Sequence, residues 1–293
     1  MVERDRLQQI LMHVFMILLI LCCVLPFLLM VSASFTEEAT LARNGYQFIP
    51  EAFSLETYNY IFRSASTIFR GYGMTIFITV VGTLSNLILT ILFAYPLSRK
   101  DLPFRSGISF FLFFTMLFNG GLVPTYMMYA NTLHIKNTIW ALIVPSLMMN
   151  AFYVIMMRSF FSSSIPDALI EAAKLDGASE LRVLSKIILP LSKPMVVTLV
   201  LMVGLNYWND WMNGLYYVSD QNLYTIQMIL NNMINNINFL AKNASLFGAT
   251  KVDLPTIGIR MGIAVIAVLP VMIIYPFLQK YFVKGIVIGG VKG

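Results

Sequence analysis

Polar side chains inside long apolar segments are the residues of this sequence best placed to do chemistry. Polar groups are costly in an apolar surrounding, so those that occur there are candidates for contact with a solute. The run YWNDW, residues 207–211, adds two indole rings, an amide and a carboxylate. Aromatic faces pack against sugar C–H surfaces while amides and carboxylates bind hydroxyls, which favours a hydroxyl-rich solute. The candidates for a solute path are Asn150, Tyr153, Asn206, Trp208, Asn209, Asp210 and Trp211.

Other interpretations of these residues remain open. Trp208 and Trp211 are also typical of the aromatic belt at a membrane surface. Asn150 and Asn206 are equally suited to hydrogen bonds between packed helices. Asp210 carries a charge and therefore weakens the case for a wholly uncharged lining.

Catalytic and metal-binding motifs do not accompany these residues. The sequence holds no GxxxxGK[ST], GxSxG, HExxH or CxxC pattern, and the glycine-rich run 285–293 departs from the first of these. Cys22 and Cys23 are adjacent, and His13 and His134 lie far apart, so no disulfide or metal site is indicated. We expect a protein that is not an enzyme, with no catalytic residue and with neither cofactor nor metal of its own.

Residues 164–193 interrupt the apolar sequence with a polar, charged segment. Ser164 and Asp167 flank Pro166 in a pattern typical of a helix start. Gly177 should end that helix, because glycine enters the left-handed conformation without a Cβ penalty.

A second helix is expected directly after the glycine. Ser179 is a candidate cap, and apolar residues then repeat at helical spacing until Pro190 and Pro194. The two helices would form an amphipathic hairpin suited to docking on another protein. A plain connector between two membrane spans is the alternative.

This spacing resembles the EAA loop of the permease subunits of bacterial ATP-binding-cassette importers. Three further runs, FNGGLVPTYMM, NTIWALIVP and YWNDW, resemble the carbohydrate-uptake permeases of the oligosaccharide or polysaccharide type. The resemblance covers essentially all 293 residues. It implies that the ATPase-coupling residues are Glu171, Ala172, Ala173, Asp176, Gly177, Ile187, Leu189 and Pro190.

The same resemblance implies a function and a set of partners. The chain would form half of a translocation pathway for a carbohydrate delivered by an extracellular solute-binding protein. A homologous second permease would supply the other half, and two ATPase subunits would bind ATP and Mg. A permease for a non-sugar solute would share the hairpin and differ in its lining. A receptor or intramembrane enzyme acting alone would need a motif of its own.

Composition favours a membrane protein independently of that resemblance. Apolar residues make up 58% of the chain and charged residues 12%, with a mean hydropathy of +0.76. Charged residues fall in clusters, and the apolar segments between the clusters reach the about 20 residues that a helix needs to cross a membrane. The first of these apolar segments is too long for the core of a signal peptide, so we expect it to remain in the protein as a membrane anchor. We predict one all-α, polytopic membrane domain over 1–293, with spans at 10–33, 71–97, 107–129, 138–157, 194–212 and 259–280 and a helical cytoplasmic coupling loop.

The third span is the weakest of the six, because Asn119, Gly120, Gly121 and Pro124 would bend its end. Lysine and arginine placement predicts the orientation, since thirteen of the twenty lie on the side of both termini and the hairpin. We therefore expect a multi-pass protein of the bacterial cell membrane, in contact with lipid, with both termini cytoplasmic. No basic stripe with interleaved aromatic residues indicates nucleic acid.

Three connecting segments complete the expected organisation. Residues 35–70 should form a small external elaboration. Residues 214–257, rich in asparagine, should form an external amphipathic helix or loop, which the resemblance implies would probe the binding protein; a solvated connector is the alternative. The glycine-rich cytoplasmic tail, 283–293, is a poor helix former. The resemblance implies an extended strand lying against the ATPases, and a disordered tail is the alternative.

Overall fold

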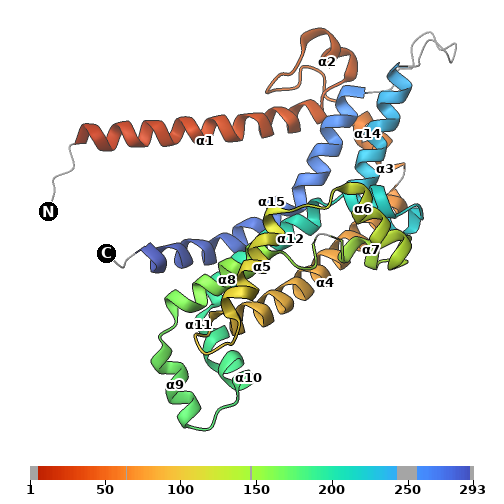
Figure 1. Ribbon diagram of the computed structural model, residues 1–293. Coiled ribbons are helices and arrows are strands. Elements are labelled where there is room, and N and C mark those ends of the chain that lie inside the picture. Colours follow the sequence, from red (N-terminus) through yellow and green to blue (C-terminus); the bar gives the residue numbers. More distant parts are fainter. Residues whose placement is uncertain (1–5, 64, 146, 243–255, 291–293) are drawn as a thin grey trace. The chain divides into compact units, whose positions relative to one another are not determined.

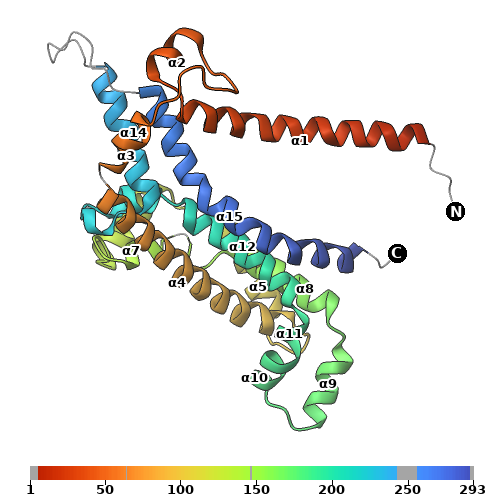
Figure 2. The ribbon, with the colours of Figure 1, turned by 180° about the vertical axis from the view of Figure 1, so that it is seen from behind.

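The fold is almost entirely helical, as Figures 1 and 2 show. The computed structural model describes residues 6–63, 65–145, 147–242 and 256–290. Over these ranges the β-structure amounts to one isolated bridge between Thr36 and Phe53. The all-α class is therefore confirmed. The chain divides into two compact units, one made of residues 1–68 and 230–271 and the other of 69–229 and 272–293.

The first unit collects the N-terminal helices and part of the C-terminal region. Its α1 is long and apolar, and its most apolar stretch has no residue buried within the described structure. Glu38 receives hydrogen bonds from the backbone N–H groups of Ile257 (2.9 Å) and Gly258 (3.0 Å), where a carboxylate is favoured because these groups open a helix. The helices are α1 (Arg6–Ser34), α2 (Glu38–Asn44), α3 (Glu56–Phe62), most of α14 (Ile226–Lys242) and the first part of α15 (Thr256–Gly290).

The second unit contains the main apolar core. Leu142, Val154, Leu199 and Val203 are at most 1% exposed and belong to one buried cluster. Most of α4 (Ala65–Ser98) lies in this unit. The other helices are α5 (Arg105–Leu117), α6 (Leu122–Met127), the π-helical turn η1 (Met128–Thr132), α7 (Trp140–Ile143), α8 (Ala151–Ser164), α9 (Asp167–Leu175), α10 (Glu180–Val183), the π-helical turn η2 (Leu184–Ile188), α11 (Leu189–Leu191), α12 (Lys193–Asn209), α13 (Met212–Tyr217) and the 3₁₀ turn η3 (Gln221–Leu223).

In the part of the chain that the structure describes, fewer helices qualify as membrane spans than the six that the hydropathy pattern predicts, and two helix pairs are bent. Among the described residues, α1, α4 and α15 are long and apolar enough to cross a membrane, and the number rises to five if each of two bent pairs is one span. The α5 and α6 pair turns through 112°, which confirms the bend expected in the third span. The pair formed by Glu180–Leu191 and α12 turns through 82°.

The expected fourth span, 138–157, is not one continuous helix, and this corrects the sequence prediction. Helix α7 ends at Ile143 and α8 begins only at Ala151. Pro145 accounts for the end of α7, because it lacks the backbone N–H that would continue the helical hydrogen bonds and its ring clashes with the carbonyl four residues earlier.

Side chains from other helices satisfy the backbone carbonyls exposed by this break. The Tyr207 hydroxyl donates to the Ile143 carbonyl (2.9 Å), and the Asn86 amide donates to the Leu147 carbonyl (2.6 Å). The Asn213 amide donates to the Pro145 carbonyl (3.0 Å). Non-helical backbone is tolerated in an apolar protein where its polar groups find such partners. The break is therefore a feature that specific side-chain contacts stabilise.

Gly82 makes room for one of these side chains. A Cβ at this position of α4 would lie 2.4 Å from the ring of Tyr207, closer than real contacts allow. Tyr207 is 2% exposed and comes from α12. The missing side chain at 82 thus lets α4 and α12 approach closely enough for the tyrosine to reach the broken span.

The prediction for the asparagine-rich segment agrees with the structure, whereas the prediction for the C-terminal tail does not. Residues of the former build α14, and Ile237 is buried while Asn235 and Asn236 are exposed, so the amphipathic helix is confirmed. Residues 243–255 of that expected loop lie outside the described residues. The expected extended tail is wrong, because α15 continues to Gly290. Helical hydrogen bonds satisfy the backbone groups of residues 283–290 within the chain itself, and residues 291–293 of the expected tail lie outside the described residues.

We predict that Gly82→Ala destabilises the protein while Gly73→Ala on the same helix does not. Overpacking against Tyr207 should cost about 1–3 kcal/mol, whereas a Cβ at Gly73 meets no atom within 4 Å. Thermal unfolding of the detergent-solubilised protein measures the difference. Equal melting temperatures for the two variants would show that the close approach at Gly82 is unimportant.

Candidate coupling site

The polar segment forms a helical hairpin whose first arm is α9 (Figure 1). After Leu175 the chain turns through Gly177, which has φ 77°. The Gly177 N–H donates to the Lys174 carbonyl (3.0 Å) and the Ala178 N–H to the Ala173 carbonyl (2.9 Å). This pair of bonds defines a Schellman ending, which requires the left-handed residue that glycine supplies. The predicted glycine turn is confirmed.

The start of α9 differs from the sequence prediction. Ser164 is the last residue of α8 and does not cap α9, which begins at Asp167 after Pro166. Proline fixes its own φ and directs the preceding residue into an extended conformation, so α8 has to end before it. Asp167 instead uses its carboxylate for an ion pair described below.

The second arm combines α10, η2 and α11. Ser179 occupies the N-cap position with φ −69° and ψ 157°, but its side chain makes no capping hydrogen bond. The π-helical turn Leu184–Ile188 precedes Pro190. Since proline lacks an N–H and its ring clashes with the carbonyl four residues earlier, a locally wider turn relieves the conflict. The arm ends at Leu191, ahead of the bend into α12.

The hairpin has a buried side and an exposed tip. Ile170, Val183, Leu184 and Ile188 are at most 6% exposed. Leu175, by contrast, is 89% exposed. Two further apolar residues, Leu181 and Leu169, are 71% and 45% exposed. Exposed leucines on a polar hairpin make this tip a candidate surface for another protein.

The residues that the resemblance nominates for coupling lie along this hairpin. Glu171, Ala172, Asp176, Gly177 and Pro190 are exposed. Ala173, Ile187 and Leu189 are half-buried. Glu171 makes neither a hydrogen bond nor an ion pair within the described part of the chain, and it is exposed. Their role in coupling stays a prediction.

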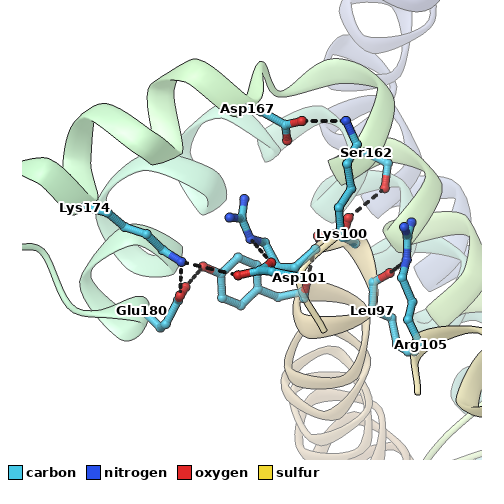
Figure 3. Close-up of polar contacts among 11 residues, drawn as sticks. Leu97, Lys100, Asp101, Arg105, Ser162, Asp167, Lys174 and Glu180 are labelled. Atoms are coloured by element: carbon cyan, nitrogen blue, oxygen red, sulfur yellow. Dashed lines mark hydrogen bonds and ion pairs between the residues drawn. The ribbon is translucent and has the colours of Figure 1, made fainter. Parts of the chain in front are cut away.

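A cluster of polar contacts ties both arms of the hairpin to the end of α4 (Figure 3). Lys174 of α9 and Glu180 of α10 form an ion pair at 2.5 Å. The Tyr95 hydroxyl of α4 donates to the other Glu180 carboxylate oxygen. Lys174 also lies 3.8 Å from Asp101, which in turn pairs with Arg99 at 3.4 Å. The tip of the hairpin is therefore held against the α4 end from both arms.

A second contact holds the other end of α9. Lys100, just beyond α4, pairs with Asp167 at 2.8 Å, as Figure 3 shows. The Ser162 hydroxyl of α8 donates to the Ser98 carbonyl at the end of α4 (3.4 Å). Sequence reasoning missed these tethers, because each joins residues more than 60 positions apart and no local pattern marks them.

The tethers act on the charge state of both acidic residues. The hydrogen bond from Lys174, with the one from Tyr95, lowers the pKa of Glu180. The hydrogen bond from Lys100 lowers the pKa of Asp167. A lowered pKa stabilises the tethered state above the usual pKa of about 4 for a carboxyl, and that contribution is lost as the pH falls through the lowered value. Both tethers are thus complete at neutral pH.

The solute-path candidates fall into separate environments. The Asn206 amide of α12 donates to the Tyr153 hydroxyl of α8 (2.7 Å). Asn150 caps α8 by accepting from the Phe152 N–H (2.9 Å). Trp208 is 6% exposed, and its ring centroid lies 6.4 Å from that of Tyr72.

The remaining candidates lie where α12 ends. Asn209 is exposed and Trp211 is 38% exposed. Asp210 accepts hydrogen bonds from the backbone N–H groups of Met212 (3.2 Å) and Asn213 (3.3 Å), which start α13. The structure therefore joins Asn206 with Tyr153 and places Asp210 at a helix break.

We predict that Tyr95→Phe and Glu180→Gln each loosen the hairpin by removing the same contact. Trypsin cleavage after Arg182 should speed up in each single variant, and the double variant should show less than the sum of the two effects, since coupled partners are not additive. Limited proteolysis of the purified protein reads this out.

Glu171→Gln is the matched control, because it neutralises an exposed carboxylate on the same hairpin that makes no ion pair among the described residues. Fully additive effects of Tyr95→Phe and Glu180→Gln, or equal loosening by Glu171→Gln, would contradict the tether.

Comparison with known proteins agrees with this geometry. Residues 102–288 match the family described as "Binding-protein-dependent transport system inner membrane component". The chain is 38% identical over 290 residues to the polygalacturonan/rhamnogalacturonan transport system permease protein YtcP of Bacillus subtilis, covering 99% of this chain and 100% of that one. It is 40% identical over 272 residues to the protein LplC of the same organism, covering 92% and 90%.

A solved structure shares the fold. The bacterial ABC transporter involved in the import of the acidic polysaccharide alginate contains a chain with a TM-score of 0.80 and 27% identity, covering 96% of this chain and 99% of that chain. More than half of the present chain matches the family, and the coupling hairpin lies within the matched residues. The protein belongs to the family of inner membrane components of binding-protein-dependent transport systems.

Proposed function

We propose that the chain is a permease subunit of an ATP-binding-cassette importer and forms half of a translocation pathway for a carbohydrate, in particular an oligosaccharide. The names of similar proteins support the solute class: one refers to polygalacturonan and rhamnogalacturonan, and another to arabinooligosaccharides. The solved relative imports alginate. The family supports the transport role.

The tethered hairpin is the observation that carries this proposal. Its tip exposes Leu175 and Leu181 and is also held against the end of α4 by the contacts among Tyr95, Lys174 and Glu180. A surface that must receive force from another protein needs both an exposed docking face and a stiff connection to a span. The hairpin combines the two.

The mechanism follows from this connection. The sequence holds no nucleotide-binding motif, so energy comes from two partner ATPases that bind ATP and Mg. Closure of the ATPases moves the docked hairpin, and the tethers pass that displacement to α4 while the bend at Leu191 passes it to α12. The spans then alternate between inward-open and outward-open states.

The remaining partners and the orientation belong to the same proposal. A homologous second permease supplies the other half of the pathway, and an extracellular binding protein delivers the solute. The excess of lysine and arginine on the side of the hairpin supports a cytoplasmic position for the hairpin and both termini in a bacterial cell. The apolar, unburied surface of α1 faces lipid or the second permease.

Assembly and solute-dependent ATPase activity test the function directly. The permease, its chromosomal neighbours and a candidate binding protein would be reconstituted in liposomes, and ATP hydrolysis measured with and without oligosaccharide. Stimulation by a sugar-loaded binding protein is expected. A complex stimulated by amino acids or metal complexes and not by any sugar would replace the carbohydrate by a non-sugar solute.

Gly177→Val is predicted to uncouple transport from ATP hydrolysis. A Cβ at Gly177 has open space around it, so the cost is the positive φ alone, at about 1–2 kcal/mol. Gly177→Asn is the control, because asparagine tolerates this conformation. Vesicles should show less solute transported per ATP for valine than for asparagine, and equal coupling in both would remove the turn from the mechanism.

The orientation is tested by cysteine labelling. Ser179→Cys and Asn232→Cys, each in a background without Cys22 and Cys23, are expected to react from opposite sides of the membrane. A membrane-impermeant maleimide applied to intact cells should label only position 232. Labelling of both positions from outside would overturn the assigned topology.

A further inference from the structure

Three breaks in the helices of the second unit meet at one cavity. The first is the bend between α5 and α6, the second is the gap between α7 and α8, and the third is the end of α12 at Asp210. Residues from all three breaks line a cavity of about 370 Å³. The lining includes Asn119 and Gly121 at the first break, Leu147 at the second and Asp210 at the third, together with Tyr216 and Tyr217.

Convergence of helix breaks has a physical meaning in an apolar protein. Each break leaves backbone groups that lack helical partners, and such backbone is tolerated where it is buried in protein or faces a polar cavity. In transporters, discontinuous helices supply the polar groups of solute sites. The volume falls within the ~300–1,000 Å³ range of small-molecule sites, which accommodates a short piece of a carbohydrate and not a long chain.

The polar groups of the lining are held in place by the protein. Oδ1 of Asp210 accepts the two N–H groups that begin α13, and the Asn213 side chain also hydrogen-bonds to this carboxylate. A carboxylate offers about four acceptor sites, so Asp210 can still accept from a ligand. Oδ1 of Asn119 accepts from the Gly121 N–H (2.9 Å), which leaves its amide NH₂ to donate. The Tyr217 ring stacks on Tyr126 with centroids 5.5 Å apart. These acceptors, donors and aromatic surfaces are the groups that recognise a sugar ring.

Charge narrows the ligand further. Asp210 is an acidic residue, and no Lys, Arg or His occurs among the described residues that line the cavity. A carboxylate without a neighbouring cation repels an anionic sugar and accepts hydrogen bonds from neutral hydroxyls. We propose that this cavity binds a neutral, hydroxyl-bearing sugar unit. Asp210 and Asn119 form hydrogen bonds with its hydroxyls, and Tyr216 lies beside its ring. This inference rests on the proposed function and adds the class of sugar.

The test compares two carboxylates that play the same backbone role. Asp210 caps α13, and Asp220 caps η3 by accepting from the Asn222 N–H (2.9 Å), but only Asp210 lines the cavity. Asp210→Asn and Asp220→Asn both keep an oxygen for the cap, since asparagine caps as well as aspartate. Both variants should therefore fold, and equal melting temperatures of the assembled permease and ATPase complex check this.

Binding is measured by ligand-observed NMR on that complex without the binding protein. The probes are methyl glycosides of neutral hexoses and 6-deoxyhexoses, together with hexuronates and their methyl esters. We expect neutral glycosides and esters to bind and free hexuronates to bind at least several-fold more weakly. Asp210→Asn should weaken the binding of the neutral probes about fivefold to tenfold. It should also reduce the difference in affinity between the neutral probes and the hexuronates. Asp220→Asn should change neither the affinity for neutral probes nor this difference.

Failure of this inference is distinguishable from failure of the proposed function. No binding by any neutral probe, a preference for free hexuronates, or equal effects of Asp210→Asn and Asp220→Asn would overturn the sugar site. Those outcomes leave intact a complex that hydrolyses ATP in response to a loaded binding protein. A permease that does not assemble with ATPases would instead overturn the proposed function.

Discussion

Backbone hydrogen bonding in an apolar surrounding is the constraint on which the second unit depends. Pro145 breaks the fourth expected span, and the carbonyls near it lose their helical partners. Tyr207, Asn213 and Asn86 reach them from α12, α13 and α4. Helices distant in sequence are thereby joined through one non-helical segment. Gly82 belongs to the same arrangement, since Tyr207 occupies the space that a side chain there would fill.

The hairpin of α9 and α10 depends on local contacts for the shape of its turn and on distant contacts for its orientation. Gly177 and the two bonds around it shape the turn using neighbouring residues only. That turn would form in many orientations without further support. Tyr95 and Lys100, at the end of α4, select one orientation by pairing with Glu180 and Asp167. The proposed coupling role depends on this second set of contacts, because a freely hinged hairpin would move without moving the spans.

Polar residues within apolar segments serve structure first in this protein. Asn86 and Asn213 satisfy backbone carbonyls, and Asn150 caps α8. Asp210 also caps a helix, yet it remains in contact with a cavity. The physical reason is common to all four: a side chain that compensates a helix break lies where the backbone is irregular, and irregular backbone is where cavities form.

The sequence by itself determined the features that depend on local interactions. Hydropathy and charge spacing predicted the all-helical membrane class, and the spacing around Gly177 predicted the turn, because a positive φ is a property of that residue and its neighbours. The bend near Gly121 was visible for the same reason.

Only the tertiary structure decided the features that depend on distant residues. The break at Pro145 is tolerated because Tyr207 and Asn213 lie beside it, and Ser179 makes no capping bond although its position suggested one. The Tyr95 to Glu180 contact joins positions 85 residues apart. No spacing rule links residues at that separation, because their proximity results from how the helices pack and not from the chain between them.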